Sequence, residues 1–205
     1  MNKIIATLLI HTVVFLSTMF SQDEVRFLYN SGLEAGNQGN FESARGAFKK
    51  ALQLDSLYVP AKFNLQVAED ALANRLPEAA ARCYFRAIQL GQADSLDKKI
   101  VQLNNAIELS PTFGLAFNER GISYANKAEY DLAIADYHKA IQLLPHWSEI
   151  YINLALSCDK SERWDEARSA YRKFLELAPP GYEWYIFHAR RRLSELQSSR
   201  PSQLE

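Results

Sequence analysis

Glycine, proline and cysteine are all scarce in this chain: its 205 residues include 8 Gly, 7 Pro and 2 Cys. Together with a hydrophobic content of 48%, this scarcity argues against a disordered chain and leaves enough apolar surface for a buried core. An excess of charge of either sign is also missing, because the formal net charge is −1. The one dense cationic run, Arg190 to Arg192, is interpreted as a solvated helix face, so no nucleic-acid partner is expected.

The N-terminal segment, from Met1 to Ser21, differs from the remainder. Lys3 precedes an apolar stretch from Ile4 to Leu16, and the stretch from Ser17 to Ser21 is short and mostly small or polar. This order predicts a secretory signal peptide at residues 1–21, cleaved after Ser21, and hence an exported protein that is periplasmic or secreted. An uncleaved membrane anchor is the alternative, because residues 4–20 are at the short end of a bilayer span.

The remainder is rich in alanine and leucine, broken by Glu, Lys, Arg and Gln, a composition that favours helices. It also repeats itself, since the segment Phe117–Tyr124 matches Tyr151–Cys158 at a 34-residue offset. Downstream positions recur at the same offset, namely Ala133 with Ala167, Tyr137 with Tyr171, and Pro145 with Pro179. A period of this length indicates stacked supersecondary units.

Each unit is predicted to be a pair of antiparallel amphipathic helices. Gly121 and Ala155 are small, so the partner helix can approach closely, and Tyr137 fills the contact between the two helices. Pro145 ends the second helix, because proline cannot continue one. One pair cannot bury its own apolar face, and copies therefore stack on each other.

These positions resemble the tetratricopeptide repeat, with its pattern W-x2-L-G-x2-Y, then A-x3-F, then P. Residues 116–145 match the pattern closely and the 148–181 copy matches it well, although Arg120 in the first copy and Cys158 in the second stand where Leu and Tyr are usual. The resemblance implies an all-α fold: a right-handed superhelical solenoid of antiparallel helix pairs. About four repeats are expected, plus an extra helix and a C-terminal capping helix.

Repeats are expected at about residues 25–58, 114–147 and 148–181, with an irregular stretch at 59–113. Three helices are predicted in that stretch, at about 60–73, 78–91 and 96–109. Either the first two pair and the third is left over, or the last two pair. The second pairing is preferred, because it keeps the 34-residue spacing from Pro111 to Pro145. A solenoid accepts an extra helix, since each helix contacts only its neighbours.

A final helix at residues 182–197 is expected to cap the array with a polar outer face. Its residues Tyr185, Ala189 and Leu193 recur at helical spacing and are expected to dock on the last repeat. The predicted solenoid therefore spans residues 22–197, and residues 198–205 form a flexible tail.

No sequence motif indicates catalysis. The chain has no zinc-type spacing of His and Cys, no glycine-rich phosphate loop and no Gly-x-Ser-x-Gly elbow. Carboxylates such as Asp131 and Glu166 are expected to cap helices or lie on exposed faces. Cys83 and Cys158 are several predicted helices apart, too far for a disulfide. We therefore expect no enzyme, no cofactor and no bound metal.

The resemblance implies a binding groove lined by the first helix of each pair. The matching positions are Tyr29, Leu33, Leu115, Asn118, Ile122, Asn126, Ile152, Leu156 and Asp159. Two interpretations are open. The apolar residues either pack within the superhelix itself, or form a mostly apolar trough in which the asparagines pair with a peptide backbone. The lysine and asparagine with which some family members clamp a carboxylate are replaced here by Asn118 and Ile122, so that clamp is absent.

By analogy with the family, the predicted function is a non-catalytic scaffold that binds a peptide or protein partner through this groove in an extracytoplasmic compartment. The alternative is a structural, self-associating component of an envelope or secretion assembly, in which Trp184 and nearby aromatic residues form a homo-oligomer contact. Membrane contact is expected only through an uncleaved N-terminal segment.

Overall fold

The computed structural model describes residues 22–91 and 95–198, so the predicted signal peptide and residues 199–205 of the predicted tail lie outside the described residues. The regular elements within this part of the chain are all helices, as predicted. They form two compact units, which divide between Gln89 and Leu90. None of the described helices combines the length and the apolar character needed to cross a membrane.

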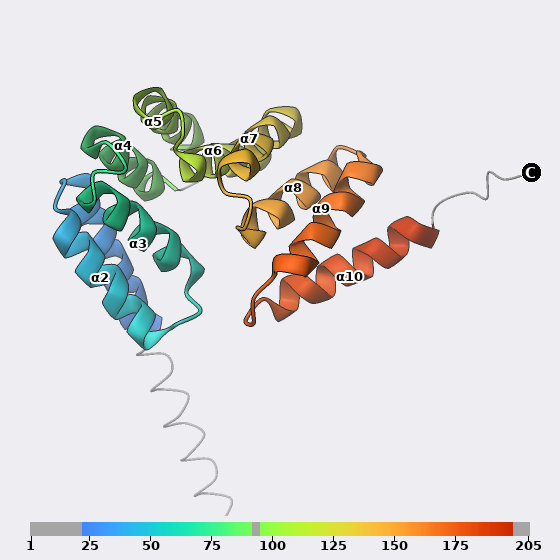
Figure 1. Ribbon diagram of the computed structural model, residues 1–205, viewed down its shortest axis with the longest axis horizontal. Helices are drawn as coiled ribbons and strands as arrows, with labels where there is room; N and C mark the ends of the chain where they lie inside the picture. Colours follow the sequence, from blue (N-terminus) through green and yellow to red (C-terminus); the bar gives the residue numbers. More distant parts are fainter. Residues whose placement is uncertain (1–21, 92–94, 199–205) are drawn as a thin grey trace, which may run out of the picture. The chain divides into compact units, whose positions relative to one another are not determined.

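Unit 1 begins with a helix described at residues 22–37, followed by α2 (Phe41–Leu54), α3 (Val59–Leu72) and α4 (Glu78–Gln89) (Figure 1). The turn before α2 depends on Gly39, whose φ of 84° lies in the left-handed region that glycine adopts without strain. Asn40 caps α2, because its Oδ1 accepts a hydrogen bond from the Ser43 N–H at 3.1 Å. The tight turn of the first repeat thus has a local cause in the sequence.

Two glycines of the first helix allow large rings to pack against its backbone. A Cβ at Gly32 would stand 2.5 Å from Cε1 of Phe48 on α2, and a Cβ at Gly36 would stand 2.5 Å from Cδ2 of Phe85 on α4. The Phe48 and Phe85 rings stack with centroids 6.0 Å apart. α4 therefore belongs to the same core as the first helix pair.

The preferred pairing of the middle helices is wrong. α4 contacts α3 and packs on the first helix in unit 1, whereas α5 (Leu96–Leu109) belongs to unit 2 and contacts α6 there. The helix left over is α5, as in the other pairing. The 34-residue spacing of the prolines indicates where helices end, but it does not indicate which of the middle helices pack their apolar faces against each other. Phe85 packs instead against the backbone at Gly36.

Unit 2 continues from α5 with helices that contact each other in chain order. They are α6 (Gly114–Asn126), α7 (Tyr130–Leu143), α8 (Ser148–Lys160), α9 (Trp164–Leu177) and α10 (Glu183–Ser198) (Figure 1). α7 and α9 end shortly before Pro145 and Pro179, which confirms the predicted stops.

The two repeats of unit 2 share their inner contacts and their turns. Tyr137 and Tyr171 are both fully buried, and a Cβ at Gly121 would stand 2.7 Å from Cε1 of Tyr137. Ala128 and Glu162 have φ values of 59° and 62°, so the same left-handed turn joins α6 to α7 and α8 to α9. The period of the sequence is therefore also a period of the structure.

α10 packs on α9, as predicted for a cap, but with a different set of residues. Ala189 is fully buried and Leu193 is half-buried, whereas Tyr185 is 42% exposed instead of docked. Tyr182 takes the inner place: it is buried, its ring lies 6.4 Å from that of Phe174, and its hydroxyl donates to Glu149 on α8.

Candidate functional site

The nine predicted groove residues differ widely in burial. Four are almost completely buried, with exposed fractions of 1–5%: Leu33, Leu115, Asn118 and Ile152. Tyr29, Ile122, Leu156 and Asp159 are half-buried, and Asn126 is exposed. The buried four pack inside their own units, which agrees with the interpretation that some of these positions serve the superhelix. A ligand could therefore reach only the other five.

Side-chain amides join neighbouring first helices in both units. In unit 2, Asn153 on α8 donates from Nδ2 to Oδ1 of Asn118 on α6, at 3.1 Å. In unit 1, Asn64 on α3 donates from Nδ2 to the hydroxyl of Tyr29 on the first helix, at 3.2 Å. Both donors lie 35 residues after their acceptors. These amides fix the distance between successive first helices.

Asn64 was not among the predicted residues. It is only 3% exposed, and Nδ2 also donates to the Pro60 carbonyl at 2.8 Å, whereas Oδ1 takes no hydrogen bond from the described part of the chain. Sequence reasoning could have found it from its position 35 residues after Tyr29, the same separation that joins Asn118 to Asn153.

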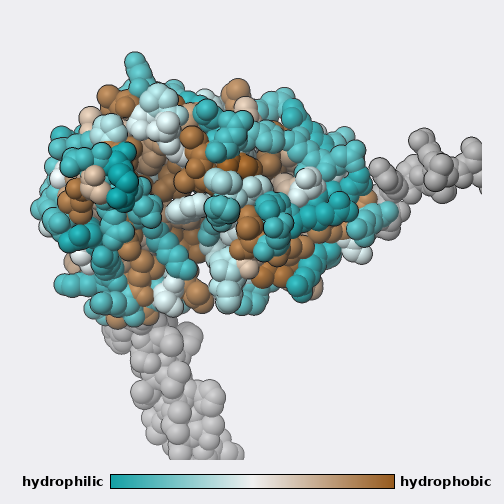
Figure 2. Space-filling view, viewed as in Figure 1, coloured by the Kyte–Doolittle hydropathy of each residue, from teal (hydrophilic) through white to brown (hydrophobic). Residues whose placement is uncertain are grey.

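Three predicted residues of unit 2 are accessible and lie outside the contact with the cap helix: Ile122, Asn126 and Leu156. We call these three residues the α6–α8 face. Ile122 lies one turn beyond Asn118 on α6, and Leu156 lies one turn beyond Asn153 on α8. Ile122 and Leu156 are one repeat length apart, and the Asn118–Asn153 hydrogen bond joins their helices, so the two residues occupy matching positions on adjacent first helices. The surface seen in Figure 2 is mainly hydrophilic, with apolar residues between the polar ones.

Two lysines near this face are paired with carboxylates of the chain itself. Lys99 on α5 pairs with Glu119 on α6 at 2.8 Å, with side-chain exposures of 9% and 14%. Lys127 pairs with Asp97 at 2.8 Å and with Glu129 at 3.0 Å. Hydrogen bonds from Lys127 to these two carboxylates raise its pKa above the usual value. Lys99 and Lys127 are therefore poor candidates for charge recognition of a ligand, whereas Lys160, one turn beyond Leu156 on α8, is exposed. The aliphatic residues of the face favour apolar contact.

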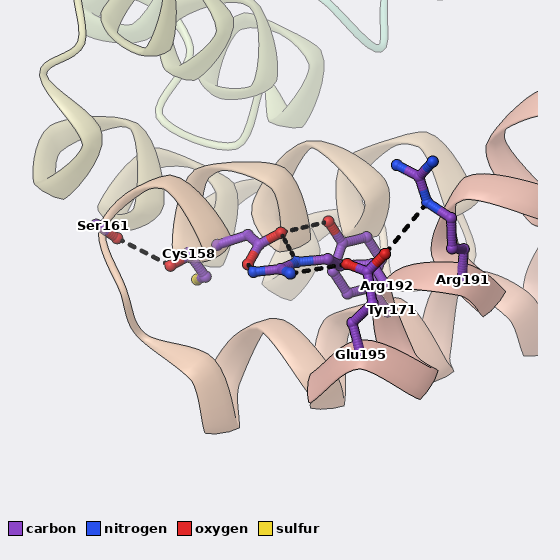
Figure 3. Close-up of polar contacts among 7 residues, drawn as sticks. Cys158, Ser161, Tyr171, Arg191, Arg192 and Glu195 are labelled. Atoms are coloured by element: carbon purple, nitrogen blue, oxygen red, sulfur yellow. Dashed lines mark hydrogen bonds and ion pairs between the residues drawn. The ribbon is translucent and has the colours of Figure 1, made fainter. Parts of the chain in front are cut away.

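Asp159, the last of the predicted residues, is held by the cap helix. Both of its oxygens accept hydrogen bonds from Arg192 on α10, at 2.6 and 2.9 Å, and Tyr171 donates to the same carboxylate at 3.3 Å. Figure 3 shows Arg192, Tyr171 and Glu195 gathered at this point between α8, α9 and α10. Hydrogen bonding to Asp159 raises the pKa of Arg192, and burial raises that of Tyr171. The Asp159 carboxylate therefore joins the cap helix to the last repeat, and its hydrogen bonds to Arg192 and Tyr171 leave it unsuited to binding a ligand.

Comparison with known families agrees with the geometry. Two family models, both described as tetratricopeptide repeat, match residues 25–56 and 148–180. The chain is a tetratricopeptide-repeat protein. The first match covers the first helix pair of unit 1, and the second covers α8 and α9 of unit 2.

Solved structures of other tetratricopeptide-repeat proteins have a similar fold. The first such domain of Spaghetti (RPAP3), bound to an HSP90 peptide, matches 60% of this chain and 93% of its own, with 17% identity and a TM-score of 0.53. A domain of yeast Sti1, in complex with pHSP90, matches 84% of this chain and 69% of its own, with 16% identity and a TM-score of 0.53. An uncharacterised protein of Methanocaldococcus jannaschii is 35% identical over 65 residues, which are 32% of this chain and 73% of that one.

This tetratricopeptide-repeat protein shows little that could act as a reactive centre. Burial raises the pKa of the Cys158 thiol to about 12, so it is a poor nucleophile at neutral pH. His138 lies 2.5 Å from Glu166 on the exposed side of α7 and α9. Within residues 22–91 and 95–198, no group of three or more His, Cys, Asp or Glu side chains could hold a metal ion.

Proposed function

We propose that this protein is a non-catalytic scaffold that binds a largely apolar, extended segment of a partner protein on the α6–α8 face. The observation that carries the proposal is the placement of Ile122 and Leu156, two half-buried aliphatic residues at matching positions of the adjacent first helices α6 and α8. Asn126 lies one turn beyond Ile122 and is exposed, so its amide can pair with the backbone of the bound segment.

The chemistry around the face supports an apolar partner rather than an acidic one. Lys99 and Lys127 are committed to Glu119, Asp97 and Glu129, so a carboxylate of a ligand would have to displace a partner already in place to reach either of them. The solved relatives are complexes with an HSP90 peptide or pHSP90, and the family likeness supports peptide binding in general. It carries no information on the sequence that this chain binds.

The compartment is a second part of the proposal. We place the scaffold outside the cytoplasm on the strength of the residue order in 1–21. The intact mass of the protein purified from its native host tests this directly. A chain that begins at Gln22 supports export, a chain that keeps its start and partitions with membranes supports the anchor, and a soluble full-length chain contradicts both.

A displayed peptide library selected on the purified protein would test the binding site. We expect selected peptides to be rich in aliphatic and aromatic residues and to lose affinity for the Ile122→Lys, Leu156→Lys variant by about tenfold or more, since two apolar contacts become charged. The matched control is Leu109→Lys with Leu132→Lys, because these leucines are 48% and 50% exposed on α5 and α7. Equal losses in the two variants, or a selection that yields no peptide, would contradict the proposed site.

A further inference from the structure

α10 stands where the first helix of a further repeat would stand. Ala189 lies one repeat length after Ala155, which in turn lies one repeat length after Gly121. In α8 the residues that face the second helix are buried, with Ile150 0% and Leu154 4% exposed. The position that matches Ile150 in α10 is Trp184, which is 67% exposed.

Two strongly exposed aromatic residues lie on one face of α10. Phe187 and Trp184 are both 67% exposed and lie three residues apart, whereas Tyr185, which is 42% exposed, lies roughly 160° from Phe187 around the helix axis. The Trp184 ring stacks on His188 with centroids 5.5 Å apart and an interplanar angle of 4°, and it meets Tyr185 edge-on at 5.0 Å. These contacts hold the tryptophan against its own helix, so the aromatic surface is preformed. Single exposed apolar residues are ordinary, but a contiguous aromatic group indicates an interaction surface.

We propose that this surface binds α10 of a second copy of the chain, with the two helices antiparallel about a two-fold axis at Phe187. In that arrangement, residues at equal distances before and after Phe187 face each other. Glu183 lies four residues before Phe187 and Arg191 four residues after it, so each carboxylate faces the guanidinium of the other copy. Trp184 and Arg190 lie three residues before and after, which brings a cation over each indole.

The exposure of these side chains permits the pairing. Glu183, Phe187, Arg190 and Arg191 are all exposed on α10. Arg191 pairs with Glu195 of its own helix at 3.4 Å, but both side chains are about half exposed, at 58% and 46%. This exposed ion pair is weak, so the Arg191 guanidinium can also bind a carboxylate of the other copy. The charge order along α10 is thus self-complementary in the antiparallel direction.

The exposed aromatic area predicts only weak self-association. If each aromatic side chain offers roughly 200 Å² when fully exposed, Trp184 and Phe187 offer roughly 270 Å² per copy and roughly 540 Å² per dimer. Stable interfaces begin at about 1,200 Å² in total, and the aliphatic stems of Arg190 and Arg191 contribute part of the remainder. This arithmetic predicts a weak, concentration-dependent dimer.

Sedimentation equilibrium of the full chain over a range of concentrations tests the proposal. The first variant is Phe187→Ser, and its control is Phe27→Ser, since Phe27 is 69% exposed on the first helix of unit 1. Loss of a central aromatic contact weakens binding by about tenfold per copy, and both copies contribute at a two-fold interface. We expect the dimer dissociation constant to rise about a hundredfold in Phe187→Ser and to stay unchanged in Phe27→Ser.

A charge exchange tests the antiparallel register. Glu183→Arg and Arg191→Glu are each expected to weaken the dimer, and the variant that combines them is expected to recover it. The recovery cannot arise within one chain, because eight residues of helix separate the two side chains by about 12 Å. Lys139→Glu, at an exposed position of α7, controls for net charge.

Three results would overturn the proposal: a chain that is monomeric at every concentration, an oligomer that Phe187→Ser and Phe27→Ser affect equally, or a combined charge variant that stays monomeric. The α10 surface and the α6–α8 face are on different helices, so failure of this test leaves the peptide-selection result standing.

Discussion

Arg120 is expected to be the most sensitive polar residue of unit 2. It stands where a tetratricopeptide repeat usually has leucine, and it joins three helices. Nε and Nη2 donate to both oxygens of Asp136 on α7 at 2.8 and 2.7 Å, and Nη1 donates to Asn104 on α5 at 2.8 Å. The two charged side chains are only 20% and 8% exposed. Hydrogen bonding to Asp136 raises the pKa of Arg120, so the cation persists at every pH at which the protein folds.

Arg120→Ala removes the cation and leaves the Asp136 carboxylate buried without it. Removing one partner of a buried ion pair costs about 3–5 kcal/mol. The residual exposure of Arg120 puts this case at the lower end, so we expect the free energy of unfolding to fall by about 3 kcal/mol. Replacing both members, by Arg120→Leu with Asp136→Ala, removes the unpaired charge as well as the pair. That variant is expected to lie within about 1 kcal/mol of the wild type, since apolar replacement of a buried pair is often neutral.

Urea unfolding followed by circular dichroism measures these free energies for the wild type, Arg120→Ala and the double variant. Arg172→Ala is the control, because Arg172 is exposed on α9 and its loss should change stability by less than about 0.5 kcal/mol. A loss below about 1 kcal/mol in Arg120→Ala would mean that the pair behaves like a surface salt bridge and would refute the reasoning.

The remaining predictions concern packing and ionisation. Gly121→Ala should lower the free energy of unfolding by about 1–3 kcal/mol, because its Cβ would stand 2.7 Å from Tyr137, whereas Gly46→Ala, which meets no atom within 4 Å, should raise it by up to about 1 kcal/mol. Equal shifts in the two urea midpoints would contradict the close approach of α6 and α7. The Cys158 thiol should resist alkylation in the folded protein and react only on unfolding, whereas half-buried Cys83 should be labelled first. The folded pKa of Cys158, about 12, exceeds the ordinary 9.0, so stability should be lost as the pH rises from 9.0 towards 12.

The candidate site could be predicted only in part. The helical period indicates which side of a first helix faces inward, and the nine groove positions were predicted from the family resemblance on that basis. It does not show how closely the next helix covers them, and therefore Leu33, Asn118 and Ile152 are buried while Ile122 and Leu156 are half-exposed. Burial at each position depends on neighbouring helices that are distant in sequence.

The sequence by itself determined the helices, their turns and their stacking in pairs. These features follow from short-range physics: a small residue such as Gly121 against a buried aromatic ring, a capped turn at Gly39 and Asn40 in the first repeat, and a proline after the second helix of both repeats in unit 2. Each of these is complete within one repeat, so the pattern of residues is enough to predict it.

Only the tertiary structure decided which elements share a core and which charged groups are already engaged. Phe85 takes α4 into unit 1 because the backbone at Gly36 has room for its ring, and Asp159 is withdrawn from any ligand because Arg192 reaches it from α10. α10 packs on α9 with Tyr182 and Ala189 buried, which leaves Trp184 and Phe187 outside the core. These outcomes depend on contacts between segments that are distant in the sequence, whose relative placement follows from packing rather than from a local pattern.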